Sequence, residues 1–188
     1  LNHAGRKASS NLPWKGGKSL ALGEDAWQAF APSAVPIADG WHMPQALDEA
    51  GLARIREAFI DSTRRAARLG LDAVELHVAH GYLLHTFLSP VSNQREDQYG
   101  GSFDNRVRFP LEILSAVRKA WPAEKPLIVR LSATDWIEGG WSLEQSIALA
   151  PLLEEAGCDV IHVSSGGVSP HQQLPSNGPG YQTGLAAA

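Results

Sequence analysis

Three side chains that can donate hydrogen bonds or protons follow one another where an apolar segment ends. The segment is AVELHV at residues 73–78, and His77, His80 and Tyr82 lie in it or directly after it. Imidazoles titrate near neutral pH, whereas phenols keep their proton at pH 7 because their reference pKa is about 10. A single histidine on an apolar strand is most often a core residue. Two histidines and a tyrosine at one strand end favour a catalytic site instead.

The two histidines also raise the question of a metal site. His77 and His80 could supply two ligands, with Glu75 or His3 as candidates for a third. A catalytic zinc or iron site needs three protein ligands and open coordination positions. The sequence places no third ligand well, so we predict no metal.

Arg130 is the second unusual residue. It stands inside the apolar run LIVRLS at residues 127–132. A cation in such a position is costly unless it is paired. A salt bridge at the sheet edge would explain it, and a contact with a bound group is the alternative.

Helical spacing of apolar residues predicts three helices around these segments. The first covers residues 48–69, with acidic residues at its start and Gly70 after its end. The second covers 105–121, where Pro110 implies a late start or a kink. The third begins with a capping box at Ser142 and Gln145 and ends at Gly157, and Pro151 predicts a bend in it.

Three predicted strands, at residues 73–78, 127–132 and 159–164, alternate with the helices and indicate a parallel sheet. A dinucleotide-binding sheet and a (β/α)8 barrel share this alternation. The glycine fingerprint of the former is absent, because Gly166-Gly167 alone is too little. In a barrel, His77 to Tyr82, Arg130 and Ser164 to Gly167 would share the C-terminal rim, where active sites form.

The stretch from Glu75 to Glu112 resembles the Old Yellow Enzyme family of flavin-dependent ene-reductases. Its H-x-x-H-x-Y pattern is most similar to the thermophilic-like and xenobiotic-reductase branch, and the likeness extends weakly from LNHAGRK (1–7) to PGYQ (179–182). The resemblance implies an α/β fold, a (β/α)8 TIM barrel of which about half is present, from the end of strand 3 to the loop after strand 6. We therefore expect residues 1–188 to be a single partial TIM-barrel, FMN-dependent oxidoreductase domain from a longer protein, inactive when isolated.

The resemblance also implies roles for the unusual residues. His77 and His80 would bind the carbonyl oxygen of an activated alkene, and Tyr82 would protonate its α-carbon. Arg130 would lie against the pyrimidine edge of FMN, with NAD(P)H as the reductant. The expected reaction is reduction of the C=C bond of α,β-unsaturated carbonyl compounds.

Weaker matches to the family lie elsewhere. His3 and Arg6 belong to an N-H-A-G-R segment that resembles the end of the third barrel strand, and Gly180 and Tyr181 are expected near the substrate mouth. A further group matches a family signature and is expected to hold the loop and the next helix: Asn93, Arg95, Asp97, Tyr99, Gly100, Gly101, Ser102, Asn105 and Arg106.

Three alternatives stay open. The chain could belong to another flavin barrel, of the dienoyl-CoA reductase or amine dehydrogenase type. It could be a metal-dependent TIM-barrel hydrolase that uses His77 and His80 as ligands. It could also be a piece that binds nothing well.

Composition sets broader limits. The chain of 188 residues is 44% hydrophobic and 19% charged, which is typical of one soluble globular domain. A net charge of −4 gives no reason to expect a nucleic acid or membrane partner. The single cysteine, Cys158, is expected to be a small buried residue and favours the cytoplasm. We expect a small-molecule alkene as the partner and a homo-oligomer at full length.

Overall fold

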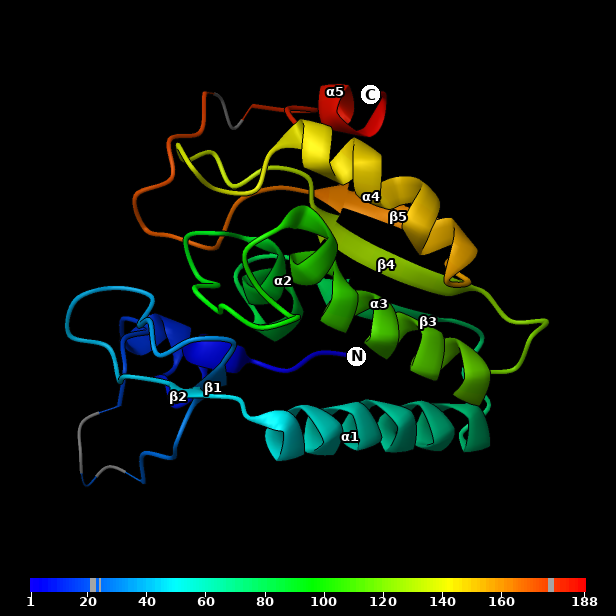
Figure 1. Cartoon of the computed structure of the whole chain (residues 1–188), viewed down its shortest axis with the longest axis horizontal. Coiled ribbons are helices and arrows are strands. Elements are labelled where there is room, and N and C mark those ends of the chain that lie inside the picture. Colours follow the sequence, from blue (N-terminus) through cyan, green and yellow to red (C-terminus); the bar gives the residue numbers. More distant parts are fainter. Residues whose placement is uncertain (21–22, 24, 176–177) are drawn as a thin grey trace.

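The computed structural model describes residues 1–20, 23, 25–175 and 178–188. Two 3-10 turns, Gly5–Lys7 and Pro13–Lys15, precede a chain in which strands and helices alternate (Figure 1). The strands and helices are β1 (Phe30–Ala31), β2 (Gln45–Ala46), α1 (Glu49–Arg68), β3 (Val74–Val78), α2 (Leu83–Leu88), α3 (Phe103–Ala120), β4 (Leu127–Ser132), α4 (Leu143–Glu155), β5 (Val160–Ser164) and α5 (Thr183–Ala186).

The central sheet is parallel, as predicted. Its strands lie in the order β3-β4-β5, and the register pairs His77 with Arg130 and Arg130 with His162. The short strands β1 and β2 form a separate parallel pair. The three predicted strands are therefore confirmed, and their C-terminal ends lie along one edge.

The N-terminal residues run beside β3. The amino group of Leu1 donates to the carbonyl of Glu75, and the N–H of His77 donates to the carbonyl of Leu1 at 2.9 Å. Slightly further along, the N–H of Leu83 donates to the carbonyl of His3 at 3.0 Å. This ladder supports the interpretation of the first residues as the end of a neighbouring strand.

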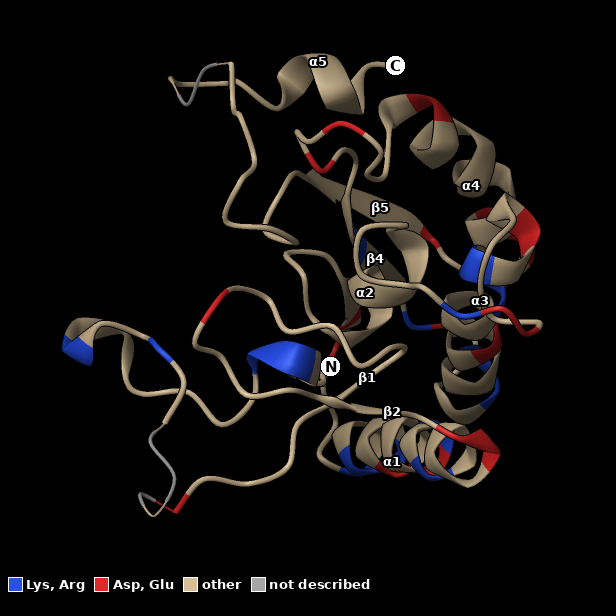
Figure 2. Ribbon diagram, turned by 60° about the vertical axis from the view of Figure 1, so that its left-hand side comes forward, with Lys and Arg blue, Asp and Glu red and all other residues tan. Residues whose placement is uncertain are grey.

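Helices α1, α3 and α4 cover one face of the sheet (Figures 1 and 2). The buried residues of the strands, such as Leu76 and Val129, belong to one core cluster with Phe59, Ile113 and Leu149 of these helices. Side chains of a strand alternate between its two faces. The opposite face therefore carries a partly exposed set: Glu75, His77, Ile128, Arg130, Val160 and His162.

The helix signals in the sequence are mostly confirmed. The side chain of Asp48 caps α1 by accepting from the N–H of Gly51 at 2.7 Å. The capping box of Ser142 and Gln145 is formed at α4. For α3, a late start at Pro110 is wrong, because Ser102 caps the helix and Pro110 lies inside it. The fully buried Phe109, beside this proline, anchors the helix despite the missing donor.

Short elements escaped the sequence patterns. Between the predicted strand 73–78 and the predicted helix 105–121, where the sequence predicts no element, lies α2, whose six residues are all buried. Cys158 is only partly buried, packs against the core, and its thiol contacts the carbonyl of Val160 at 3.1 Å. Among the described residues, no helix is long and apolar enough to cross a membrane.

Candidate active site

The predicted site residues converge at the C-terminal end of β3. The ring centroid of His77 lies 5.1 Å from that of His80 and 5.1 Å from that of Tyr82. Arg130 is the register partner of His77 on the neighbouring strand. The sequence thus identified four residues that the fold brings to one rim.

The chain leaves β3 through an unusual turn. His80 has φ +57° and Gly81 has φ +71°, so two successive residues are left-handed. Few non-glycine residues adopt this region without support. Three side chains hold the turn. The N–H of His80 donates to Ser132 Oγ at 3.0 Å, and Lys7 Nζ donates to the His80 carbonyl at 2.6 Å. The N–H of Gly81 donates to His85 Nδ1 at 2.8 Å.

The loop after β5 packs directly against this turn. A Cβ on Gly81 would lie 2.3 Å from the carbonyl oxygen of Gly167, and a Cβ on Gly167 would lie 2.5 Å from the Cα of His80. Lys7 Nζ also donates to the Gly167 carbonyl at 2.7 Å and so joins both loops. The two backbones are in contact at a distance that only glycine permits.

The ring of His80 is held from β5. Its Nε2 lies 2.7 Å from Ser164 Oγ, and Gln182 Nε2 donates to Ser164 Oγ at 3.3 Å and to Ser165 Oγ at 3.2 Å. The same amide donates to the Tyr181 hydroxyl at 2.9 Å. The segment that carries Gly180 and Tyr181 therefore lies beside the site, where the sequence placed it.

Both histidines are neutral at pH 7. Burial, reinforced by the nearby charge of Arg130, lowers the pKa of His77 to about 4, although Glu75 opposes the shift. The same two causes lower the pKa of His80 to about 4. Neutral imidazoles can still donate one N–H each to an oxygen that lies between them.

Arg130 is a cation without a counter-ion. Its Nε atom is buried and has no hydrogen-bond partner, and none of the described carboxylates forms an ion pair with it. The structure therefore does not show the salt bridge that would have explained this residue. An unpaired guanidinium on the sheet face opposite the helices can stabilise an anionic or electron-rich group beside His77.

The N-terminal segment contributes one buried and one partly buried cation. Arg6 is 3% exposed and donates to the carbonyls of Val35, Pro36 and Val168. Lys7 lies 5.3 Å from the ring centroid of Tyr82, and burial together with Arg6 lowers its pKa to about 8. His3 accepts from the N–H of Gly5 through Nδ1 and so shapes the same turn.

The signature loop after α2 has a structural role, as expected. The side-chain amide of Asn93 donates to the carbonyls of Phe87 and Tyr99 and closes the loop. Arg106 donates to the carbonyls of Leu88 and Gly101, which fixes α3 against it. These side chains support the rim and do not line it.

Sequence reasoning missed several supporting residues. Lys7, Ser132 and His85 hold the turn, but each lies on a different segment, and only tertiary contact reveals them. Ser164 lies at a strand end that the sequence placed on the C-terminal rim, but it was given no role there. In the part of the chain that the structure describes, no three His, Cys, Asp or Glu side chains form a group that could hold a metal ion.

Comparison with known proteins places the chain in a well-populated group. Residues 1–177 match the sequence model of the NADH:flavin oxidoreductase / NADH oxidase family. An NADH:flavin oxidoreductase of Gibberella zeae is 43% identical, covering 99% of this chain and 49% of the relative. An NADPH dehydrogenase of Geobacillus sp. strain WCH70 is 41% identical, covering 97% of this chain and 51% of the relative.

Solved structures agree with the barrel interpretation. A 2-naphthoyl-CoA reductase in complex with 2-naphthoyl-CoA matches with a TM-score of 0.81 and 29% identity, covering 100% of this chain and 29% of that one. The chain spans about half the length of the curated relatives it matches. The predicted α/β fold, about half of a TIM barrel, is confirmed, with β3, β4 and β5 among the barrel strands.

The contact between the two loops can be tested with Gly167→Ala. The new Cβ would meet the backbone of His80 and force the loops apart, in addition to the roughly 1–2 kcal/mol strain of a left-handed alanine. The control is Gly139→Ala, where φ is +71° and nothing lies within 4 Å of the new Cβ. Urea unfolding should show a larger loss of stability for Gly167→Ala, and equal losses would contradict the contact.

The lowered histidine pKa values predict a pH dependence. As pH falls, the unfolded chain binds protons near pH 6.5, whereas folded His77 and His80 bind them only near pH 4. Both residues therefore contribute stability that is present above about pH 6.5 and lost between pH 6.5 and 4. An NMR titration of the C2 protons should show folded midpoints near 4, against about 6.5 in urea. Folded midpoints above 6 would refute the assignment.

Proposed function

This chain belongs to the NADH:flavin oxidoreductase / NADH oxidase family, the Old Yellow Enzyme family, and on that premise we propose that it carries the substrate-binding rim of an FMN-dependent ene-reductase. The enzyme would use NAD(P)H to reduce the activated C=C bond of α,β-unsaturated carbonyl compounds. One observation carries the proposal: two neutral imidazoles, a phenol and an unpaired guanidinium share one strand-end rim.

The sheet face opposite the helices fits a flavin at Arg130. The buried Nε of this residue lacks a partner among the described residues, and a flavin offers the electron-rich edge that a guanidinium can bind. When bound, FMN supplies the hydride that NAD(P)H provides. Arg130 would hold the pyrimidine edge of the cofactor and stabilise negative charge on it.

His77 and His80 would bind the substrate carbonyl oxygen. The Nδ1 atom of His77 is buried without a partner, while Ser164 holds Nε2 of His80. A pair of N–H donors draws electron density from the conjugated C=C bond and makes its β-carbon more electrophilic. The same donors stabilise the negative oxygen that develops as hydride arrives, and their fixed rings need no reorganisation.

Tyr82 would deliver the proton to the α-carbon. Its ring lies 5.1 Å from that of His77, centroid to centroid, so its hydroxyl belongs to the same group of donors. Its backbone is fixed, because its N–H donates to the carbonyl of Ala79 at 3.2 Å and its ring packs against His77. A phenol is protonated at neutral pH and can act as a general acid there.

A second candidate is reduction of a C=C bond conjugated to an acyl-CoA thioester. The chain matches the 2-naphthoyl-CoA reductase structure along its whole length. A thioester carbonyl would accept hydrogen bonds from His77 and His80 in the same way as a ketone. Family membership favours flavin chemistry over the metal-dependent hydrolase.

Other features of the whole protein stay predictions. We propose that residues 1–188 form a single partial barrel domain, that the full-length protein is a homo-oligomer, and that it acts in the cytoplasm. The last point rests on the single cysteine.

A direct test uses the purified full-length protein. We expect a yellow protein that releases FMN on denaturation and, with oxygen excluded, turns over NAD(P)H repeatedly only when cyclohexenone is added. Crotonyl-CoA serves as the comparison substrate, and a preference for it would favour the second candidate. A colourless protein that takes up no FMN would refute both.

Tyr82→Phe tests the proton donor. The substitution removes the hydroxyl and keeps the ring that contacts His77. Stopped-flow kinetics should show about 10²–10⁴-fold slower reoxidation by cyclohexenone, the range for a lost general acid, and nearly unchanged reduction by NAD(P)H. Equal slowing of both half-reactions would mean that Tyr82 acts through shape alone.

A further inference from the structure

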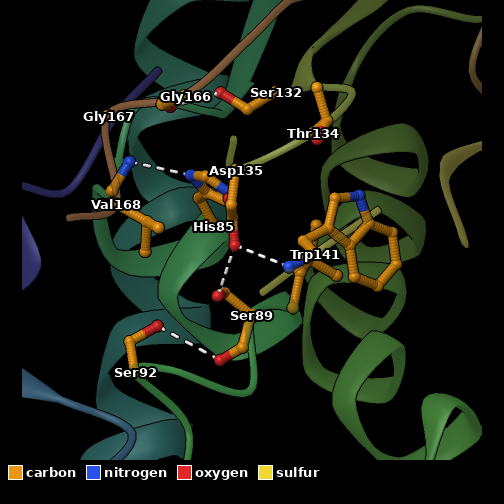
Figure 3. A network of polar contacts seen from close by, with 12 residues as sticks. His85, Ser89, Ser92, Ser132, Thr134, Asp135, Trp141, Gly166, Gly167 and Val168 are labelled. Atoms are coloured by element: carbon orange, nitrogen blue, oxygen red, sulfur yellow. Dashed lines mark hydrogen bonds and ion pairs between the residues drawn. The ribbon is translucent and has the colours of Figure 1, made fainter. Parts of the chain in front are cut away.

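A buried acid lies behind the site and has no part in the proposed chemistry. Asp135, in the loop after β4, is 0% exposed (Figure 3). Its Oδ2 accepts from the Ser89 hydroxyl at 2.5 Å and from the N–H of Trp141 at 2.7 Å. Its Oδ1 lies 2.9 Å from Nε2 of His85, which is also 0% exposed. A buried carboxylate is costly unless donors or an ion-pair partner surround it, and here Ser89 and Trp141 donate to it while His85 lies in contact.

The surroundings keep Asp135 ionised. Burial favours the protonated acid, but the His85 contact and the hydrogen bonds from Ser89 and Trp141 outweigh it and lower the pKa of Asp135 below its ordinary value. The carboxylate is therefore purely an acceptor at neutral pH.

The hydrogen bonds also define the tautomer of His85. Its Nδ1 accepts from the N–H of Gly81 at 2.8 Å, so Nδ1 carries no proton. The proton must then lie on Nε2, which faces Asp135 Oδ1. Nε2 and Oδ1 form no hydrogen bond with any other described residue, and their 2.9 Å ion-pair contact is the one close polar contact that either makes there. His85 is thus a neutral link with a donor on one side and an acceptor on the other.

This link ends at the residue between two proposed catalytic side chains. Gly81 separates His80 from Tyr82, and its φ of +71° sets the directions in which both side chains leave the turn. Rotation of its peptide would move the His80 ring away from Ser164 and the Tyr82 ring away from His77. The amide of Gly81 therefore controls the geometry of the proton donor and of one oxygen-binding imidazole together.

We propose that Asp135 and His85 are positioning residues. The carboxylate of Asp135 fixes the tautomer of His85, and His85 holds the Gly81 amide so that His80 and Tyr82 meet the substrate together. The inference rests on the proposed function for its kinetic consequence, whereas the hydrogen-bond relay itself can be measured without turnover.

An isosteric substitution separates this role from simple packing. Asp135→Asn keeps the shape but replaces one acceptor oxygen with a donor. If its NH2 group faced His85, the ring would carry its proton on Nδ1, opposite the N–H of Gly81. If the amide were reversed, its NH2 group would face the N–H of Trp141. In either orientation two N–H donors point at each other, so the turn must shift.

The test uses the FMN-loaded, full-length enzyme. Asp135→Asn should slow reoxidation by cyclohexenone by up to about 100-fold, the scale of a misplacement of about 1 Å at the reacting groups. Reduction by NADPH and flavin content should stay close to wild type. In wild-type protein with ¹⁵N-labelled histidine, NMR should show His85 protonated on Nε2 alone, and in Asp135→Asn this pattern should change.

Matched variants guard against a merely structural effect. His85→Gln carries an amide that again combines an acceptor with a donor, and it should retain more of the alkene step than His85→Leu. Thr63→Val removes a buried hydroxyl that donates only to the Phe59 carbonyl within α1, and it should leave both half-reactions unchanged. If Asp135→Asn fails to fold, the comparison of Gln with Leu at position 85 decides the question.

Three results would overturn the inference. They are a wild-type His85 that is protonated on Nδ1 or charged, equal slowing of both half-reactions by Asp135→Asn, and a His85→Leu enzyme as active as His85→Gln. Absence of enone turnover in the wild type would refute the proposed function alone, because NMR reads the tautomer of His85 without turnover.

Discussion

The site depends on a left-handed turn that must be kept fully hydrogen-bonded in a partly buried place. His80 and Gly81 leave β3 with positive φ angles, and no regular element can satisfy their polar groups. The partners come instead from the N-terminal segment, from the end of β4 and from α2. Because these segments meet only in the folded sheet, the turn forms only when the sheet does. The two donors to a substrate oxygen and the proton donor are thereby fixed by the fold as one unit.

Electrostatics at the rim follow from the same placement. The two faces of the sheet differ, since helices bury residues such as Leu76 on one face, whereas the other holds His77 beside Arg130. Burial and an unpaired cation both disfavour the charged form of an imidazole, so their effects on pKa add. Neutral rings donate hydrogen bonds through one N–H each, without placing further positive charge next to Arg130. A bound electron-rich group would in turn compensate that cation.

Short-range sequence patterns predicted the elements and residues whose structure depends on neighbouring positions in the chain. The parallel strands, α1 and α4 followed from apolar spacing and from caps such as Asp48 and Ser142. The rim residues His77, His80 and Tyr82 were found because chemistry-bearing types clustered at one strand end. Helix α2 was missed, since six consecutive buried residues show no helical period. The roles of Lys7 and Asp135 could not be predicted from the sequence. The contacts of Lys7 with His80 and Gly167, and of Asp135 with Ser89 and His85, join residues more than forty positions apart.

The close contact between Gly81 and Gly167 has a consequence for recombination among related proteins. Loops at the C-terminal rim of a barrel vary more than the strands and carry function, so grafting the loop after β5 would be one way to alter substrate preference. Here its backbone rests on the turn after β3, and Lys7 fastens the two with one ammonium group. A loop taken from another protein would carry its own backbone path into a space with no clearance. Successful chimaeras should therefore inherit both loops and the lysine from one parent, as a single block assembled from three distant parts of the chain.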